Sequence, residues 1–269
     1  MIGDGVTGLC FTFETVKRQC PICFFIIALL CVNVHAQPSG DYLKFGLGYS
    51  YQTVLDQAMS PVSYSGHFGQ LSIGYSSQNE KWLSELEIGG NGGLQYPDIG
   101  REESSRQTLS LLSRLRYTLV RQWAEMNQWR FYTGLSSMNS FDFRNHSNYV
   151  NSQTNYLALF ALGPSIGVQR EFSMLKRRWG LQVFTDLPIA GYYLRPGYIK
   201  PFFNDEVGSK GLVWWGEFFQ INTHTDLIYY LENENQLRLI YNWEYLSLEP
   251  LNKSQSGTHQ FSLCAIFKF

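Results

Sequence analysis

Apolar and polar residues alternate along most of this chain, and a period of two predicts β-strands with one apolar and one polar face. The clearest example is the segment 258–269, where Phe261, Leu263 and Phe267 share one face. Ten segments show this alternation or a strongly aromatic pattern, with turn residues between them: 41–54, 64–76, 81–91, 106–120, 129–140, 154–170, 179–192, 212–231, 236–248 and 258–269. The pattern therefore predicts an all-β chain of about ten antiparallel strands.

Three segments qualify this prediction. Twelve strands would result if 193–211 contained a further hairpin. Pro164 lies inside the predicted strand 154–170, and because proline cannot donate a ladder hydrogen bond, we expect a bulge or a frayed strand there. The run Gly89–Gly93 lacks the Lys and Ser/Thr of a phosphate-binding loop, so we expect a flexible loop at a strand end.

The connections between the predicted strands alternate in length. The short polar ones are 77–80, 121–128, 172–178 and 232–235, and the mostly longer ones are 56–63, 92–105, 141–153, 193–211 and 249–257. The longest, 193–211, carries Tyr193, Tyr198, Phe202 and Phe203 together with Pro196 and Pro201. Exposed aromatic rings with rigid prolines favour a recognition surface, and a loop folded over a barrel mouth is the equal alternative.

The N-terminal segment predicts export. Lys17 and Arg18 precede the apolar run 22–32, and Val-His-Ala at 34–36 before Gln37 fits a signal-peptidase site. A transmembrane anchor is the alternative, but the run is short for a membrane span. We therefore expect a signal peptide at 1–36 and a mature chain at 37–269.

Cysteine usage agrees with this division. Four of the five cysteines lie in the expected presequence, at Cys10, Cys20, Cys23 and Cys31. The mature chain keeps Cys264 alone, which excludes an internal disulfide and a cysteine metal cluster. A net charge of −1 without a basic stripe gives no indication of nucleic-acid binding.

These features together resemble the outer-membrane β-barrel proteins of Gram-negative bacteria. The chain ends on the aromatic Phe269 of an alternating strand, Tyr, Trp and Phe lie near many strand ends, and no apolar run after residue 36 is long enough for a membrane helix. A chain that spans lipid without helices must close its strands into a barrel. The rival is a soluble sandwich or lipocalin-like barrel with its apolar face inward.

The resemblance implies a single up-and-down transmembrane barrel at 37–269 in the outer membrane, with both termini in the periplasm. It also implies contact with outer-membrane lipid and insertion by the outer-membrane assembly machinery through the C-terminal strand. Other envelope proteins are expected partners through the wall or the extracellular loops, and nucleic acid is not.

If the apolar face meets lipid, the opposite face fills the lumen with charges of both signs. The predicted lumen residues are Lys44, Arg114, Arg116, Arg130, Arg238 and Lys268, against Glu85, Glu87, Asp186, Asp226 and Glu244. In a narrow barrel this balance favours an ion-paired plug over a selective pore lining.

Candidate chemistry is sparse. His224 and Asp226 should both point into the lumen, and with the pair Glu85 and Glu87 they resemble the omptin proteases. Omptins place these groups at the outer rim, whereas here His224 and Asp226 are expected near the periplasmic end and the two glutamates at mid-barrel. Of the other histidines, His67 and His259 lie near the outer ends of strands and His146 in a loop, none in a nucleophile motif.

We therefore predict no catalytic residue, no cofactor and no metal site. The first functional hypothesis is a small non-enzymatic barrel with a plugged lumen, acting through its loops or wall as an accessory subunit of a larger envelope complex. The alternatives are a narrow passive pore for small solutes and an outer-membrane hydrolase acting on lipid or peptide.

Overall fold

The computed structural model describes residues 39–58, 60–98, 107–146, 154–195, 209–250 and 252–269. The expected signal peptide at 1–36, with its four cysteines, lies outside these residues, as do Pro196, Tyr198, Pro201, Phe202 and Phe203. Within the described part of the chain, no helix has the length and apolar character needed to cross a membrane.

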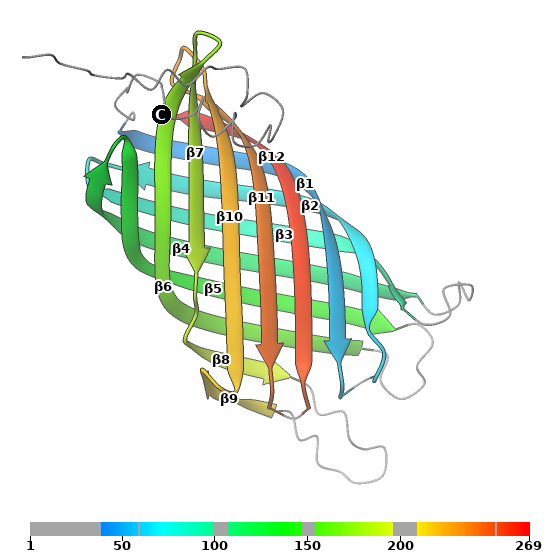
Figure 1. Ribbon diagram of the computed structural model, residues 1–269. Coiled ribbons are helices and arrows are strands. Elements are labelled where there is room, and N and C mark those ends of the chain that lie inside the picture. The colour runs from blue at the N-terminus through cyan, green and yellow to red at the C-terminus, as the bar shows by residue number, and fades with distance from the viewer. Residues whose placement is uncertain (1–38, 59, 99–106, 147–153, 196–208, 251) are drawn as a thin grey trace, which may run out of the picture.

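Twelve antiparallel strands form one sheet (Figure 1). Their bounds are β1 Gly40–Asp56, β2 Tyr64–Gln78, β3 Trp82–Pro97, β4 Thr108–Met126, β5 Trp129–His146, β6 Thr154–Met174, β7 Arg177–Asp186, β8 Ala190–Arg195, β9 Ser209–Trp214, β10 Phe218–Tyr230, β11 Gln236–Leu248 and β12 Ser254–Lys268. β1 pairs with β12 and β5 pairs with β6, so the sheet closes on itself. β7 and β8 lie end to end along β6 and together make one wall strand, and β9 and β10 likewise make one. The barrel therefore closes with ten wall strands, as the sequence predicts.

The connections divide the barrel into two ends. Turns of two to five residues follow β2, β4, β6 and β10, and we call this the short-turn end. The connections at the opposite, long-loop end have five residues or more. Two of the turns are two residues long with left-handed backbones, at Asn127 (φ 50°) with Gln128 (φ 74°) and at Leu175 (φ 53°) with Lys176 (φ 60°). Left-handed residues at both central positions match the twist of the flanking strands, as in type I′ hairpins.

The wall is interrupted where β7 gives way to β8. Asp186 pairs with Asn222, whereas Ala190 pairs with Trp214, so residues 187–189 face the longer stretch 215–221. Residues 215–221 leave the hydrogen-bonded ladder at Gly216, whose φ is +111°.

Pro164 lies opposite this interruption. β6 itself is continuous, so the expected fraying is absent, but the ladder on its β7/β8 side is broken at Pro164, where residues 163–164 face 187–189 and the bulge lies on the partner strand. Leu187 N donates to Pro164 O over 2.9 Å. A strand residue points its N and O to the same side, so the missing N–H of Pro164 faces the interruption. Gly163 completes the fit, because a Cβ there would lie 2.2 Å from Leu187 O.

Several loop predictions are also wrong, because the strands extend further than the alternation suggests. Gly89–Gly93 lies inside β3, where glycines permit close backbone approach: a Cβ on Gly93 would lie 2.2 Å from His67 O. His146 is the last residue of β5 and is buried, with its Nδ1 2.7 Å from Thr108 Oγ1. Tyr193 belongs to β8 and is buried rather than exposed in a loop.

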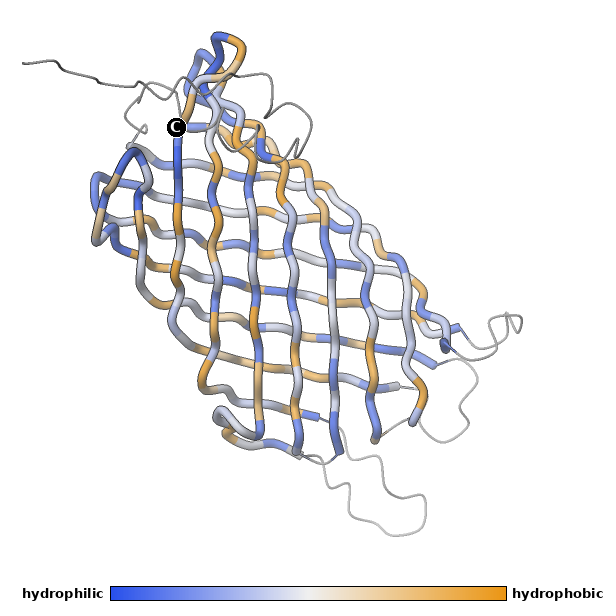
Figure 2. Tube along the Cα trace, in the orientation of Figure 1, coloured by the Kyte–Doolittle hydropathy of each residue, from blue (hydrophilic) through white to orange (hydrophobic). Residues whose placement is uncertain are grey.

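The facing of the wall follows the predicted alternation. Large apolar side chains point outward and stay exposed, with Leu47 at 68%, Leu71 at 66% and Leu263 at 61%. On β11, Leu239 is exposed whereas its neighbour Arg238 is buried. Figure 2 shows the resulting change between hydrophobic and hydrophilic positions along each strand. A soluble barrel would bury its apolar face, so this orientation excludes the soluble alternative.

Candidate functional site: the closed lumen

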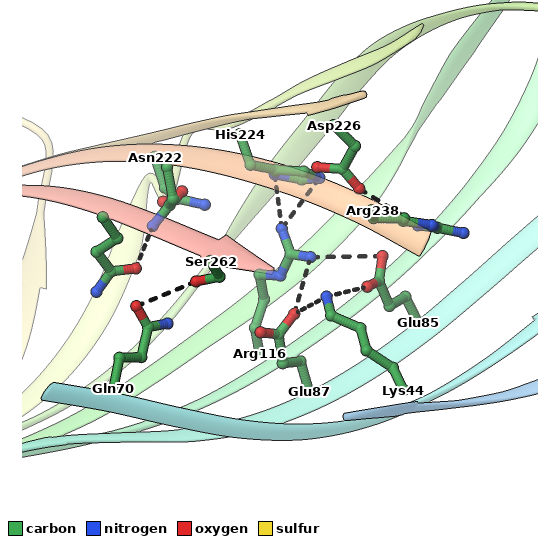
Figure 3. Close-up of polar contacts among 12 residues, drawn as sticks. Lys44, Gln70, Glu85, Glu87, Arg116, Asn222, His224, Asp226, Arg238 and Ser262 are labelled. Atoms are coloured by element: carbon green, nitrogen blue, oxygen red, sulfur yellow. Dashed lines mark hydrogen bonds and ion pairs between the residues drawn. The ribbon is translucent and has the colours of Figure 1, made fainter. Parts of the chain in front are cut away.

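The inward face of the barrel collects charged side chains from neighbouring strands and from strands that are not hydrogen-bonded to each other. At its centre, Lys44 Nζ lies 3.2 Å from Glu85 Oε1 and 2.6 Å from Glu87 Oε2. Arg116 Nη2 approaches the same two carboxylates, at 3.4 Å from Glu85 and 3.7 Å from Glu87 (Figure 3). The predicted acidic pair is therefore neutralised by two cations, and this mutual pairing is what permits burial of the charges.

Arg116 also spans the lumen from β4. Its Nη1 lies 2.7 Å from His224 Nδ1 on β10 and 3.6 Å from Asp186 Oδ2 on β7. A guanidinium only donates hydrogen bonds, so the Nδ1 of His224 is the acceptor. Phe184 stacks on the imidazole with the ring centroids 5.5 Å apart and an interplanar angle of 9°.

His224 and Asp226 point into the lumen, as predicted. The expected separation of His224 from the glutamate pair is wrong, because Arg116 contacts both groups. Asp226 pairs with Arg238, whose Nη1 lies 3.3 Å from Oδ2. The imidazole is thus held as an acceptor between a cation and an aromatic ring.

A second bridge crosses the lumen between β4 and β11. Arg114 Nη2 lies 2.8 Å from Glu244 Oε2, and Gln220 Nε2 donates to the other oxygen of Glu244 over 3.1 Å. Both members of this ion pair were predicted lumen residues, and the structure brings them together.

A third bridge lies toward the long-loop end and was not predicted. Asp56, the last residue of β1, accepts hydrogen bonds from Asn155 Nδ2 on β6 at 3.0 Å and from Arg195 Nη2 on β8 at 2.6 Å. Arg144 Nη1 lies 3.9 Å from the same carboxylate. Arg195 also donates to the backbone oxygens of Pro250 and Asn252, which ties the connection after β11 to the bridge.

A further cluster links three successive strands toward the short-turn end. Glu171 accepts hydrogen bonds from Arg130 Nη2 at 2.5 Å and from Arg178 Nη2 at 2.6 Å. Arg130 was a predicted lumen residue, whereas its two partners were missed. Lys268 contacts Glu234 in the turn after β10, so it lies at the rim and not deep in the lumen.

Apolar side chains share the inward face with these charges. In the described part of the chain, buried apolar residues form three clusters: Leu157, Leu159, Ala161, Tyr193, Val213, Phe218, Leu246 and Leu248; Tyr42, Ile240, Cys264 and Ile266; and Leu83, Val120, Tyr132 and Phe184. Each cluster excludes water from part of the lumen. The plug is therefore both ionic and hydrophobic, and only its ionic part was predicted.

Between these layers the lumen keeps a cavity of about 80 Å³. Its lining includes six charged residues, Lys44, Glu87, Arg114, Arg116, Asp226 and Glu244, and seven amides, Gln70, Asn91, Asn139, Gln220, Asn222, Asn242 and Gln260. None of these amides was singled out as a site residue from the sequence. The inward parity that all of them except Asn139 share was the available signal.

The chain was compared with known proteins. No family model matches the chain, and no curated protein matches it. Similar solved structures include the translocator domain of autotransporter NalP from Neisseria meningitidis, with 9% identity over 95% of this chain and 98% of that chain and a TM-score of 0.44. The outer membrane protease OmpT from Escherichia coli shows 6% identity over 88% of this chain and 99% of that chain, with a TM-score of 0.49.

A third similar structure is the COG4313 outer membrane channel from Pseudomonas putida F1. It shows 11% identity over 86% of this chain and 97% of that chain, with a TM-score of 0.36. The class follows from the structure itself, because a closed antiparallel barrel with an apolar exterior and a charged interior satisfies every requirement of a lipid-spanning sheet. The chain is an outer-membrane β-barrel of the Gram-negative type.

Proposed function

We propose that this protein is a non-enzymatic outer-membrane barrel with a plugged lumen, which acts through its loops or its wall as an accessory subunit of a larger envelope complex. The observation that carries the proposal is the set of bridges across the lumen: Arg116 to His224, Arg114 to Glu244, and Asp56 to Asn155 and Arg195. A permeating ion would have to separate buried pairs at each of these positions, and breaking such pairs is costly.

Conductance in planar bilayers tests the plug. The purified full chain should insert without large, stable current steps. Steps of a size and stability typical of an open pore would overturn the proposal.

Purification from native membranes under mild detergent tests the accessory role. A stoichiometric partner that remains bound to the barrel supports this role. A barrel that purifies alone, and gains no neighbour on chemical cross-linking in cells, contradicts it.

A narrow passive pore for small solutes is the second candidate, and the luminal cavity favours it. Small discrete current steps, with swelling of proteoliposomes in small sugars but not in larger ones, would select this candidate. The hydrolase alternative receives no such support, because His224 is engaged by Arg116 and Phe184. Loss of a lipid- or peptide-hydrolysing activity on replacing His224 by Phe would revive it.

Export and orientation belong to the same proposal. Cleavage after Ala36 would release a chain beginning at Gln37, with both ends of the barrel chain in the periplasm. In support, β1 begins and β12 ends at the short-turn end, where Phe269 N donates to Asp41 O over 3.1 Å, and short turns face the periplasm in this class. N-terminal sequencing of membrane-extracted protein tests this, and retained residues 20–30 would contradict it.

A further inference from the structure

The luminal cavity is lined by amide side chains that are fixed at one end and unpartnered at the other. Asn242 Nδ2 donates to Gln260 Oε1 over 2.9 Å, and Asn222 Nδ2 donates to Asp186 Oδ2 over 3.1 Å. Among the described residues, Asn242 Oδ1, Gln260 Nε2, Asn222 Oδ1 and Gln220 Oε1 have no hydrogen-bond partner. Because Gln220, Asn222 and Gln260 are at least nine-tenths buried, these atoms need hydrogen-bond partners, which water or a ligand that both donates and accepts hydrogen bonds would supply.

The charges of the lining are paired with one another, which disfavours an ionic ligand. Lys44 pairs with Glu87 at 2.6 Å and Arg114 with Glu244 at 2.8 Å. Asp226 pairs with Arg238, and Arg116 is shared among acidic partners. A charged solute would therefore either enter unpaired or break a buried pair, and both are unfavourable.

Size and shape restrict the guest further. A cavity of about 80 Å³ offers room for about six water molecules, at roughly 10–15 Å³ for each. Met138 and Ile240 contribute apolar surface to the same lining. A small molecule with several hydroxyl groups and an aliphatic backbone meets both kinds of surface.

We propose that the cavity is a binding site for a small uncharged polyol of about the size of glycerol. The pair Asn242 and Gln260 presents one acceptor and one donor side by side, which matches a hydroxyl group that donates and accepts at once. The binding site does not require an open, conducting lumen. A ligand that enters slowly, while the ion pairs of the plug open transiently, still reaches binding equilibrium.

Equilibrium dialysis of the folded full chain in detergent against radiolabelled glycerol tests the proposal. Long incubation accommodates slow entry, and heat-modifiable mobility on gels verifies that each sample is folded. We expect saturable binding of about one glycerol for each barrel, displaced by unlabelled glycerol but not by glycerol 3-phosphate. The variant Asn242→Leu/Gln260→Leu should bind about tenfold more weakly or not at all, because it removes the donor and acceptor pair.

The control is Thr225→Leu, which makes a similar change on the outward face of β10 and should bind like the native chain. If the double variant does not fold, the single variant Gln260→Leu is measured in its place. If the native chain and the Asn242→Leu/Gln260→Leu variant retain equal amounts of radiolabelled glycerol, the label associates with the detergent or the barrel wall. That result would overturn the proposed binding site. Equally strong displacement by glycerol 3-phosphate would overturn the exclusion of charge.

Discussion

The guanidinium of Arg116 on β4 lies 2.7 Å from Nδ1 of His224 on β10, and the two residues are 108 positions apart in the chain. Neither strand pairs with the other, so this contact exists only because the sheet closes. When the sheet closes, the polar faces of β4 and β10 line the same interior. Charged side chains on one strand can then pair with side chains on a distant strand.

The first prediction concerns these bridges. Replacing Arg114 and Arg116 together by Ala removes the cations that face Glu244 and Asp186 across the lumen. The free energy of unfolding should fall by at least about 3 kcal/mol, because buried carboxylates would lose their cations. Denaturant midpoints in lipid vesicles measure this, with Arg121→Ala on the exposed outer face as the control. Midpoints equal to that of the control would mean that water already solvates the lumen charges.

The second prediction tests the facing of β11. Tyr241 points outward and Asn242 inward toward the cavity. Arg at position 241 should cost about 2–4 kcal/mol where the side chain faces the bilayer core. Arg at position 242 should cost less, because Glu244 and the cavity lie nearby. Refolding both variants into vesicles and comparing their urea midpoints decides between them, and a larger penalty at 242 would reverse the assigned facing.

A third prediction addresses the interruption of the wall. Gly163→Ala should destabilise the barrel by about 1–3 kcal/mol, because the added Cβ overlaps Leu187 O and the backbone must shift. Gly90→Ala is the matched control, since a Cβ at Gly90 meets nothing within 4 Å. Thermal unfolding in detergent should separate the two variants. Indistinguishable unfolding temperatures would show that the 187–189 segment moves aside freely.

The fourth prediction uses the turn between β6 and β7. Leu175 and Lys176 adopt left-handed backbones that cost an ordinary L-residue roughly 1–2 kcal/mol each. Asn-Gly in their place should therefore stabilise the barrel by about 1 kcal/mol, because this pair favours the type I′ turn. The unfolding rate in urea reports the gain. An unchanged or faster rate would show that the side chains of Leu175 and Lys176 contribute more than their backbones cost.

The sequence by itself determined the strand count, the facing of most of the wall and the inward position of the charges. The bounds 236–248 of β11 were predicted without error, and Arg238 and Glu244 face inward as their parity requires. This success has a local cause: side chains alternate with a fixed period, so the face of each residue follows from its neighbours.

Only the tertiary structure decided which inward residues meet, and where the alternation changes phase. Inward positions are even-numbered in β7, as at Gln182 and Asp186, and odd-numbered in β8, as at Tyr193 and Arg195. A single-residue slip reverses the facing of all that follows, and here the slip is set by Gly163 and Pro164 on the neighbouring strand. Arg195 could therefore not be placed beside Asp56 from either local pattern, because both the slip and the closure of the barrel depend on residues distant in the chain.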